Sequence, residues 1–421
     1  MAEGTGLQVV VIGAGVVGMA AASFLQRDGH RVTVIDPGGP GEGASFGNAG
    51  CLNGSSVVPM SMPGMLSSVP RWLLDPEGPL VIRWRYLPVI APWLWRFIRA
   101  GEPAKVEAQA RALRSLLAPS VDAYLSLARD AGAADLIHRA GHLWVYQSEA
   151  SFAKDTAAME LRRRNGVTVD DLGEDELRQM EPSLSRAYRR GRFVAENGHV
   201  GNPHRLVKSL AEALVRNGGR VLRERAFGFE FAGGKVSAVR SEGGIHKADR
   251  VVVAAGAWSK PFAAALGDKV PLDTERGYHI VLRDPEVVPR MPVSSAEGKF
   301  VATPMETGLR MAGTVEFAGL EAPPDWRRAR MLLKQARAMF PGLPPEVPEE
   351  RLSLWMGFRP SLPDSLPVIG PATRHPNAIY AFGHGHVGLA CGAMTGRLVA
   401  DLVAGRPPSV DIAPFRVGRF A

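Results

Sequence analysis

The strongest constraint on the fold is a run of glycines between a strand and a helix near the start of the chain. Residues 7–12, LQVVVI, form a short apolar run of strand type, and the glycines of GAGVVG follow directly. Helix-forming residues occupy 19–28, and a second strand-like run, RVTVID, occupies 31–36. A strand, a helix and a second strand in this order predict a β-α-β unit with parallel strands.

The three glycines of GAGVVG have separate roles in such a unit. Gly13 allows the tight turn, Gly15 lets a pyrophosphate approach the backbone, and Gly18 lets the helix pack against the strand. Asp36, at the end of the second strand, can accept hydrogen bonds from an adenosine ribose. The pattern predicts a dinucleotide site, although the spacing alone does not separate NAD from FAD. The residues assigned to this site are Gly13, Gly15, Val16, Val17, Gly18, Asp36 and Pro37.

Composition narrows the class of protein. The 421 residues, 46% of them hydrophobic, are enough for two or three domains with a large core. Only two cysteines occur, Cys51 and Cys391, so we expect no disulfide framework and a reduced, cytoplasmic setting. We expect neither a signal peptide nor a transmembrane helix, because the apolar runs are short and broken by glycines. The net charge of +8 is spread along the chain, which argues against nucleic-acid binding.

Further segments along nearly the whole chain indicate FAD rather than NAD. They are GASFGNAG (43–50), VVVAAGAWS (251–259), RGY (276–278), MGFRPSLPDSLPVIG (356–370) and YAFGHGHVGL (380–389). In this order and spacing, together with VIGAGVVG, the chain resembles the D-amino-acid oxidase superfamily of FAD-dependent amine oxidoreductases. Within that superfamily it is most similar to the bacterial D-amino-acid dehydrogenases.

The resemblance implies an α/β fold with two domains. A Rossmann-like FAD-binding domain would be discontinuous and built from residues 1–58, 195–268 and 352–421. An α+β substrate domain with a mixed antiparallel sheet would be built from residues 59–194 and 269–351. The flavin would lie between the domains, with its reactive face toward the substrate sheet.

The resemblance also implies where the cofactor, FAD, is held. The GASFGNAG loop would run beside the pyrophosphate and the flavin, and its small residues suit that place because backbone amides can then reach a flat ring; a plain surface turn is the alternative. Residues 254–258 would line the adenosine end. Cys51 is a conceivable covalent tether, but tight non-covalent binding is the default. The residues assigned here are Ala44, Ser45, Asn48, Ala49, Gly50, Cys51, Ala255, Gly256 and Trp258.

Three residues are candidates for the catalytic site. Arg359 matches the carboxylate-binding arginine of the family; a guanidinium makes two parallel bonds to a carboxylate, and a surface salt bridge is the alternative. Tyr278, in RGY, would bind the substrate carboxylate or shape the pocket, unless it is a core tyrosine. Arg310 matches a basic position of the family, unless it pairs with a neighbour such as Glu316. Because adjacent strand residues face opposite ways, Tyr278 and His279 are not both expected to face substrate.

The C-terminal stretch AFGHGHVGLACGAM first suggests a metal site, with His384, His386 and Cys391. No companion cluster of histidines or cysteines exists, so we expect no metal. The glycines are better explained by close backbone approach, with the amides of a helix from Val387 directed at the flavin C2 carbonyl. His386 is also a candidate for a catalytic contact, with structural packing as the alternative. The residues assigned to this flavin cradle are Gly383, His384, Gly385, His386, Val387, Gly388 and Leu389.

Tryptophans and arginines interleave over residues 70–99. This tract contains Trp72, Trp84, Trp93 and Trp95 together with Arg71, Arg83, Arg85, Arg96 and Arg99. Such a mixture suits a membrane interface, and a helical cap over the substrate domain is the alternative. A peripheral contact with the inner membrane is therefore one interpretation of the tract.

These features together predict FAD-dependent oxidation of a D-amino acid. Hydride transfer from Cα to flavin N5 would give an imine, which hydrolyses to a keto acid. The electrons would then pass to quinone, another carrier or oxygen. One alternative substrate is a secondary amine or glycine, such as D-hydroxyproline, D-proline or sarcosine. A second alternative is an FAD-binding subunit of a hetero-oligomeric dehydrogenase.

Overall fold

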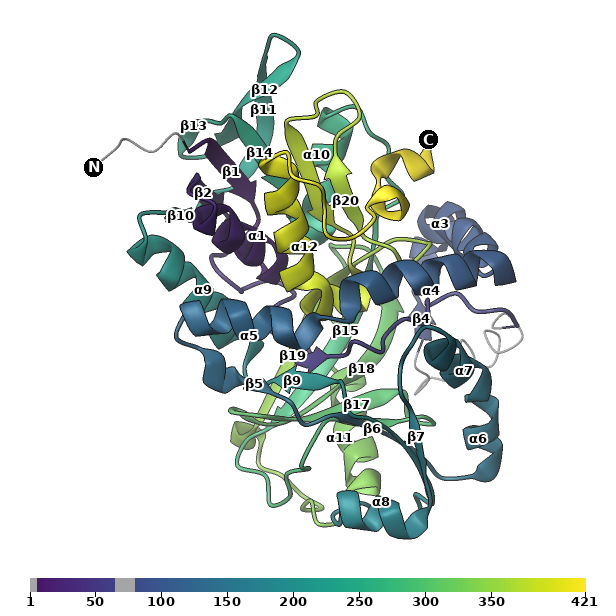
Figure 1. Ribbon diagram of the computed structural model, residues 1–421. Helices are drawn as coiled ribbons and strands as arrows, with labels where there is room; N and C mark the ends of the chain where they lie inside the picture. The colour runs from purple at the N-terminus through teal and green to yellow at the C-terminus, as the bar shows by residue number, and fades with distance from the viewer. Residues whose placement is uncertain (1–5, 65–79) are drawn as a thin grey trace.

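Two β-sheets form the two halves of the molecule (Figure 1). The computed structural model describes residues 6–64 and 80–421. The six-stranded sheet lies in the half that holds both ends of the described chain, and the larger sheet forms the other half. The predicted α/β class with a mixed antiparallel sheet is confirmed.

The six-stranded sheet is parallel except for one edge strand. The predicted β-α-β unit is confirmed, since β1 pairs in parallel with β2 and α1 connects them. The strands are almost wholly buried, as expected for a parallel sheet that is covered on both faces. Across the sheet they are β10 (Arg220–Leu222), β2 (Arg31–Ile35), β1 (Gln8–Ile12), β14 (Arg250–Val253), β21 (Ala378–Phe382) and antiparallel β20 (Val368–Pro371).

Helices cover one face of this sheet, and a small meander with one short helix covers the other. The first group packs its apolar sides around α1, which lies against the yellow α12 (Figure 1). It comprises α1 (Val16–Arg27), α5 (Ser120–Asp130), α9 (Pro203–Arg216) and α12 (Gly388–Val403). The other face carries β11 (Ala226–Ala232), β12 (Lys235–Ser241), β13 (Gly244–Lys247) and α10 (Ser259–Ala265).

Glycines set the distance between these elements. Gly13 has φ +109°, and a Cβ there would lie 2.3 Å from the carbonyl oxygen of Ala254. A Cβ on Gly18 would lie 1.9 Å from the carbonyl oxygen of Gly13, so the start of α1 can sit directly on the turn. Gly396 likewise allows α12 to approach α1 closely, since a Cβ on Gly396 would lie 2.6 Å from the carbonyl carbon of Ala20. The helix pair α1 and α12 therefore packs backbone to backbone.

The large sheet is mixed and faces the first half with one side. Its other side packs on α11 (Arg327–Met339) and α8 (Glu174–Met180) around a core that includes Leu332 and Leu177. Its strands in order are β19 (Leu352–Ser361), β15 (Asp273–Leu282), β18 (Gly308–Phe317), β17 (Phe300–Met305), β16 (Val293–Ser295), β6 (His142–Tyr146), β8 (Arg190–Val194) and β7 (Asp170–Leu172), with β4 (Leu80–Ile82) beside β18.

The remaining described elements lie outside these two sheets and their covering helices. They are β3 (Cys51–Leu52), β9 (Gly198–Val200) and β5 (Ile137–His138), α3 (Leu87–Ala100), α4 (Pro103–Leu117), α6 (Glu149–Lys154) and α7 (Thr156–Arg164), and the 3-10 turns at Trp84–Tyr86, Ala134–Leu136, Gly256–Trp258, Glu349–Arg351, Gly385–Val387, Ala413–Phe415 and Val417–Phe420. Among the described residues, none of the helices combines the length and the apolar character that a membrane crossing requires.

One predicted domain segment begins with a strand of the other half. The segment 352–421 was assigned to the cofactor domain, but β19 at its start pairs with β15 along its whole length. Leu352–Ser361 therefore belongs to the large sheet. The remaining domain boundaries stay a prediction.

The backbone contact between α1 and α12 gives a stability prediction. Gly396→Val places a side chain against the backbone of Ala20, which cannot move without displacing α1. We expect a loss of about 1–3 kcal/mol in the free energy of unfolding, measured as a lower midpoint of urea unfolding. Gly228→Val is the matched control, because no atom lies within 4 Å of its Cβ position on β11. Equal midpoints for the two variants would contradict the packing argument.

Candidate active site

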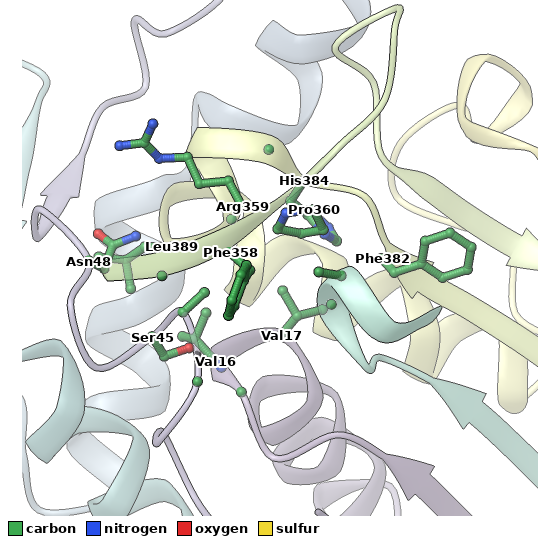
Figure 2. A pocket seen from close by; sticks show the side chains of 18 of the residues that line it. Val16, Val17, Ser45, Asn48, Phe358, Arg359, Pro360, Phe382, His384 and Leu389 are labelled. Atoms are coloured by element: carbon green, nitrogen blue, oxygen red, sulfur yellow. Dashed lines mark hydrogen bonds between the residues drawn. The ribbon is translucent and has the colours of Figure 1, made fainter. Parts of the chain in front are cut away.

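A cavity of about 980 Å³ lies between the two sheets. Its wall on one side comes from the ends of β1 and β2, the first turn of α1 and the loop after β2; on the other side it comes from the faces of β15 and β19. Figure 2 shows Val16, Val17 and Ser45 on the first side, with Arg359 and Pro360 opposite them. The cavity therefore joins the glycine turn to the large sheet.

The glycine turn is held by two side chains from the following segment. Asp36 accepts hydrogen bonds from the amide of Ala14 (2.9 Å) and from the amides of Gly38 and Gly39. The hydroxyl of Ser45 accepts a hydrogen bond from the amide of Val16 at 2.9 Å. Both side chains line the cavity. The ribose contact expected of Asp36 stays a prediction, but its role in fixing the turn is visible.

The loop that follows is fastened to the large sheet. Arg310 donates from Nη1 to the carbonyl oxygen of Asn48 at 2.6 Å, and the Nδ1 of His279 is 2.9 Å from the carbonyl oxygen of Gly47. The indole of Trp355 stacks on His279 and lies so close to Gly47 that a Cβ there would be 2.1 Å from the ring. Three strands thus hold one loop, so its backbone enters the cavity at a defined place.

This geometry corrects the expectation for Arg310. The side chain does not line the cavity, and its partner is not Glu316 but the backbone of the loop. Burial lowers the pKa of Arg310 to about 10, which still leaves the group charged at neutral pH. Arg310 therefore positions the loop.

The side chain of Arg359 lies over a glycine of the neighbouring strand. Gly277 and Gly357 face each other across β15 and β19. The Arg359 guanidinium covers Gly277, where a Cβ would be 2.3 Å from Nη2, and the Trp355 indole covers Gly357. Because neither glycine has a side chain, both large side chains can lie flat along the cavity wall.

The charge of Arg359 is left without a carboxylate partner. Its Nη1 donates to the carbonyl oxygen of Thr314 at 3.0 Å, and no carboxylate oxygen of the described chain lies within 4.0 Å. Burial lowers the pKa of Arg359, and the nearby Glu275 opposes that shift. Since a cation kept from water needs a counter-charge, the site is suited to an anionic ligand that enters the cavity.

The hydroxyl of Tyr278 is bonded to groups of the protein itself. It donates to Glu316 at 2.5 Å and accepts from the amide of Asp325 at 3.0 Å, and the side chain is 1% exposed. Because Arg359 pairs across the strands with Glu275, it shares a face with Gly277 and His279, whereas Tyr278 faces the opposite side. Burial and Glu316 raise the pKa of Tyr278 to about 12. The hydroxyl is therefore already bonded within the protein, although Tyr278 is among the residues that line the cavity, and the expected carboxylate contact stays a prediction.

The C-terminal histidines take different positions at the start of α12. His384 is buried and bonded through Nε2 to the hydroxyl of Thr395 at 2.9 Å. His386 lines the cavity; burial, and to a smaller extent the charge of Arg359, lowers its pKa to about 4. Both rings are therefore neutral at pH 7. The predicted flavin or substrate contact of His386 remains a prediction.

Most residues assigned from the sequence line this one cavity. Gly18, Gly50 and Gly383 do not, because their hydrogens point at protein: a Cβ would be 1.9 Å from the Gly13 carbonyl, 2.6 Å from Met305 and 2.3 Å from Leu362, respectively. The assigned residues that do line it are Gly13, Gly15, Val16, Val17, Asp36, Pro37, Ala44, Ser45, Asn48, Ala49, Cys51, Ala255, Gly256, Trp258, Tyr278, Arg359, His384, Gly385, His386, Val387, Gly388 and Leu389.

Other lining residues were missed because no motif marks them. Gly277, Trp355 and Gly357 lie inside or beside the quoted segments, and a pair of glycines on adjacent long strands was the available signal. A cluster of mostly polar side chains at the end of the cavity away from Arg359 could not be recognised in the sequence, since its members are far apart along the chain. It consists of Asn53, Ser56, His142, Trp144, Arg162 and Ser294.

The residues present fit an FAD molecule. Two helix N-termini, those of α1 and α12, open on the cavity, and their first-turn amides have no partner within the helix. No atom lies within 4 Å of a Cβ position at Gly385, so the backbone there faces open space. Burial raises the pKa of Cys51 to about 12, so this thiol is not a ready thiolate, and non-covalent binding is favoured.

Fold and cavity together define a dinucleotide-dependent oxidoreductase of the flavoprotein type. The family described as DAO, FAD dependent oxidoreductase, matches residues 8–402, and the chain belongs to this family. Its cofactor is FAD.

Two relatives and one solved structure illustrate the likeness. The chain is 46% identical over 418 residues to a D-amino-acid oxidase of Bradyrhizobium diazoefficiens, covering 99% of each chain. It is 31% identical to D-amino acid dehydrogenase 2 of Mesorhizobium japonicum, covering 96% of this chain and 98% of the relative. The crystal structure of glycine oxidase from Geobacillus kaustophilus is similar in fold, with a TM-score of 0.71, 21% identity and 98% of each chain covered.

Buried neutral histidines give a pH prediction. Burial lowers the pKa of His142, His279 and His384 to about 3 each, against about 6.5 in an unfolded chain. Their contribution to stability is fully present above pH 6.5 and is lost as the pH falls from 6.5 toward 3. Each group should cost about 1.4 kcal/mol per pH unit in that window, seen as a falling unfolding midpoint.

His384→Gln separates this effect from general acid sensitivity. The amide can still bond Thr395 but cannot titrate, so the midpoint should fall less steeply with pH than in the wild type. His375→Gln, at a surface ring bonded to the Gly234 carbonyl, is the control and should follow the wild-type slope. An unchanged slope for His384→Gln would show that this ring does not titrate on unfolding.

Proposed function

We propose that the protein oxidises a D-amino acid to the imine, which hydrolyses to the keto acid. The observation that carries the proposal is the Arg359 guanidinium, which lies on the Gly277 floor of the cavity without a carboxylate partner in the described chain. The names of the relatives at 46% and 31% identity support the same substrate class.

Binding and orientation are the main contributions of the chain itself. The carboxylate of the substrate would bind the free edge of Arg359, and this contact fixes the direction of Cα in the cavity. FAD, when bound, supplies the hydride acceptor. His386 is too weak a base at pKa about 4 to remove a proton from an ammonium group, so the substrate would react with its amine neutral.

Arg359→Leu tests the proposal. Loss of the guanidinium should raise KM for D-alanine by roughly 100-fold, since removing one partner of a desolvated charge pair costs about 3 kcal/mol. FAD content, read from the flavin absorbance, should stay at the wild-type level. Kinetics equal to the wild type would remove Arg359 from substrate binding, and a wild-type enzyme inactive on a panel of D-amino acids would refute the function.

Tyr278→Phe is the matched control for that experiment. Its hydroxyl is bonded to Glu316 and to the Asp325 amide, so kcat/KM should change by no more than about threefold. The free energy of unfolding should fall by about 1 kcal/mol, because Glu316 and the Asp325 amide each lose a partner. A large rise in KM with unchanged stability would support the catalytic role first expected of this residue.

We further propose that the electron acceptor is a membrane quinone, reached from a surface around α3. Trp84 is 77% exposed and Trp95 58% exposed, and Arg99 lies over the Trp95 ring. Arg85 and Arg96 are also exposed. Outward aromatic rings beside cations are suited to an anionic interface.

Other residues of the predicted tract serve the alternative, a cap over the substrate half. Trp93 is buried against Ile90 and Phe317, and Arg83 is bonded to Glu316 at 2.7 Å. Trp72 and Arg71 lie outside the described residues. The same helix therefore covers the large sheet with one side and offers its aromatic residues outward with the other.

Vesicle binding tests the membrane proposal. The protein should sediment with vesicles that contain phosphatidylglycerol, less so at high salt, and the double variant Trp84→Ser/Trp95→Ser should bind several-fold less. Ile245→Ser, at an exposed apolar residue of β13 in the other half, is the control. Wild-type protein that stays in the supernatant at low salt would refute the contact.

A further inference from the structure

The cavity has a second polar region, at the end away from Arg359. It is built where the chain after β3, strands β6 and β16, and the end of α7 meet. Asn53, His142 and Ser294 form its floor, and Arg162 and Trp144 form its wall. None of these residues is needed to hold the dinucleotide turn described above.

Arg162 is the charged group of this region. Its Nε donates to the carbonyl oxygen of Ser55 at 3.1 Å, and Nη1 is 3.6 Å from the sulfur of Met159, a weak acceptor. Nη2 has no hydrogen-bond partner in the described chain, and no carboxylate oxygen there lies within 4.0 Å of the guanidinium. The guanidinium thus keeps unused donors beside the cavity.

A neighbouring arginine, Arg192, is paired with carboxylates, in contrast to Arg162. Arg192 is 1% exposed and contacts Asp171 at 3.0 Å and Asp155 at 3.7 Å. Asp155 raises the pKa of Arg162 only in part, and burial lowers it overall. Asp155 and Asp171 therefore pair with Arg192. Arg162 has no carboxylate partner in the described chain, and it lines the cavity.

Among the surrounding polar groups, the side-chain amide of Asn53 adds a further donor. The Nδ1 of His142 is 3.2 Å from Oδ1 of Asn53, and its Nε2 is 2.8 Å from the hydroxyl of Ser294. An amide oxygen only accepts, so His142 carries its proton on Nδ1, and the Nδ2 of Asn53 remains without a partner in the described chain. Trp144 stacks on His142 and lies under Arg162 at 5.5 Å, which fixes both groups.

The separation from Arg359 suits the two ends of one small substrate. Gly277, beneath the Arg359 guanidinium, and Ser294 lie on strands three steps apart in the order β15, β18, β17, β16. Three steps span roughly 14 Å at the usual strand spacing, and the register, which aligns Ser294 with His279, adds an offset of two residues, or roughly 7 Å, along the strands. Two guanidinium–carboxylate contacts and the chain of a glutamate between them cover a distance of this order.

We propose that Arg162, with Asn53 and His142 beside it, forms a second carboxylate subsite that selects acidic D-amino acids, D-glutamate above others. The inference rests on the proposed function. The α-carboxylate binds Arg359 and the side-chain carboxylate binds Arg162. The same substrate then accepts hydrogen bonds from the unpaired donors at both ends of the cavity.

The test compares D-glutamate with D-glutamine, which has the same shape without the charge. In the wild-type holoenzyme, kcat/KM for D-glutamate should exceed that for D-glutamine at least tenfold. In Arg162→Met the ratio should fall to about one or below, and Arg162→Lys should retain part of it. Arg164→Met is the control and should keep the wild-type ratio. Arg164 is an exposed arginine on the same helix as Arg162, and it is paired with Glu107 of α4.

A second measurement needs no variant. Glutarate should inhibit the wild-type oxidation of D-alanine at a concentration at least tenfold lower than butyrate, which has only one carboxylate. A wild-type ratio near one, a ratio unaffected by Arg162→Met, or equal inhibition by the two acids would overturn the subsite. Because D-alanine oxidation is measured in the same experiment, loss of all activity would instead refute the proposed function.

Discussion

Carbonyl oxygens of the loop at residues 46–48 are bound by side chains of the large sheet, and this joint holds the two walls of the cavity together. Arg310 reaches Asn48 and Phe46, and His279 reaches Gly47. Backbone carbonyls that are removed from water need a donor, so the loop cannot leave this path without a cost. The joint fixes how far the cofactor loop stands from the strands that carry Arg359.

Three arginines near the joint lack a carboxylate within 4.0 Å in the described chain, and they are completed in different ways. Arg310 is satisfied by loop carbonyls, whereas Arg359 and Arg162 each have one oxygen partner from the protein and face the cavity. Burying a charge without a partner is unfavourable. A fold that pairs Arg192 and Arg276 with carboxylates elsewhere leaves these two charges for a ligand.

Local patterns predicted the parts of the site that depend on backbone geometry. Gly13 and Gly18 are required where strand meets helix, and the segment around Arg359 lies in the cavity as its motif indicated. It was harder to predict from the sequence which side of the sheet a given strand residue faces. Alternation allowed only one of Tyr278 and His279 to share the face of Arg359, and the sequence did not show that it is His279. The register of β15 against β19 decides the matter, and β15 also contains an irregularity beside Tyr278 where it pairs with β18.

The sequence by itself determined the β-α-β unit, the dinucleotide turn and the motif that carries Arg359 into the cavity, because each depends on residues that are neighbours along the chain. Only the tertiary structure decided that Arg310 serves the loop, that the Tyr278 hydroxyl is bonded to Glu316 and that Arg162 shares a cavity with Arg359. Arg162 and Arg359 are almost two hundred positions apart. Their meeting depends on the pairing order of a mixed sheet, which long-range packing selects and local propensity does not encode.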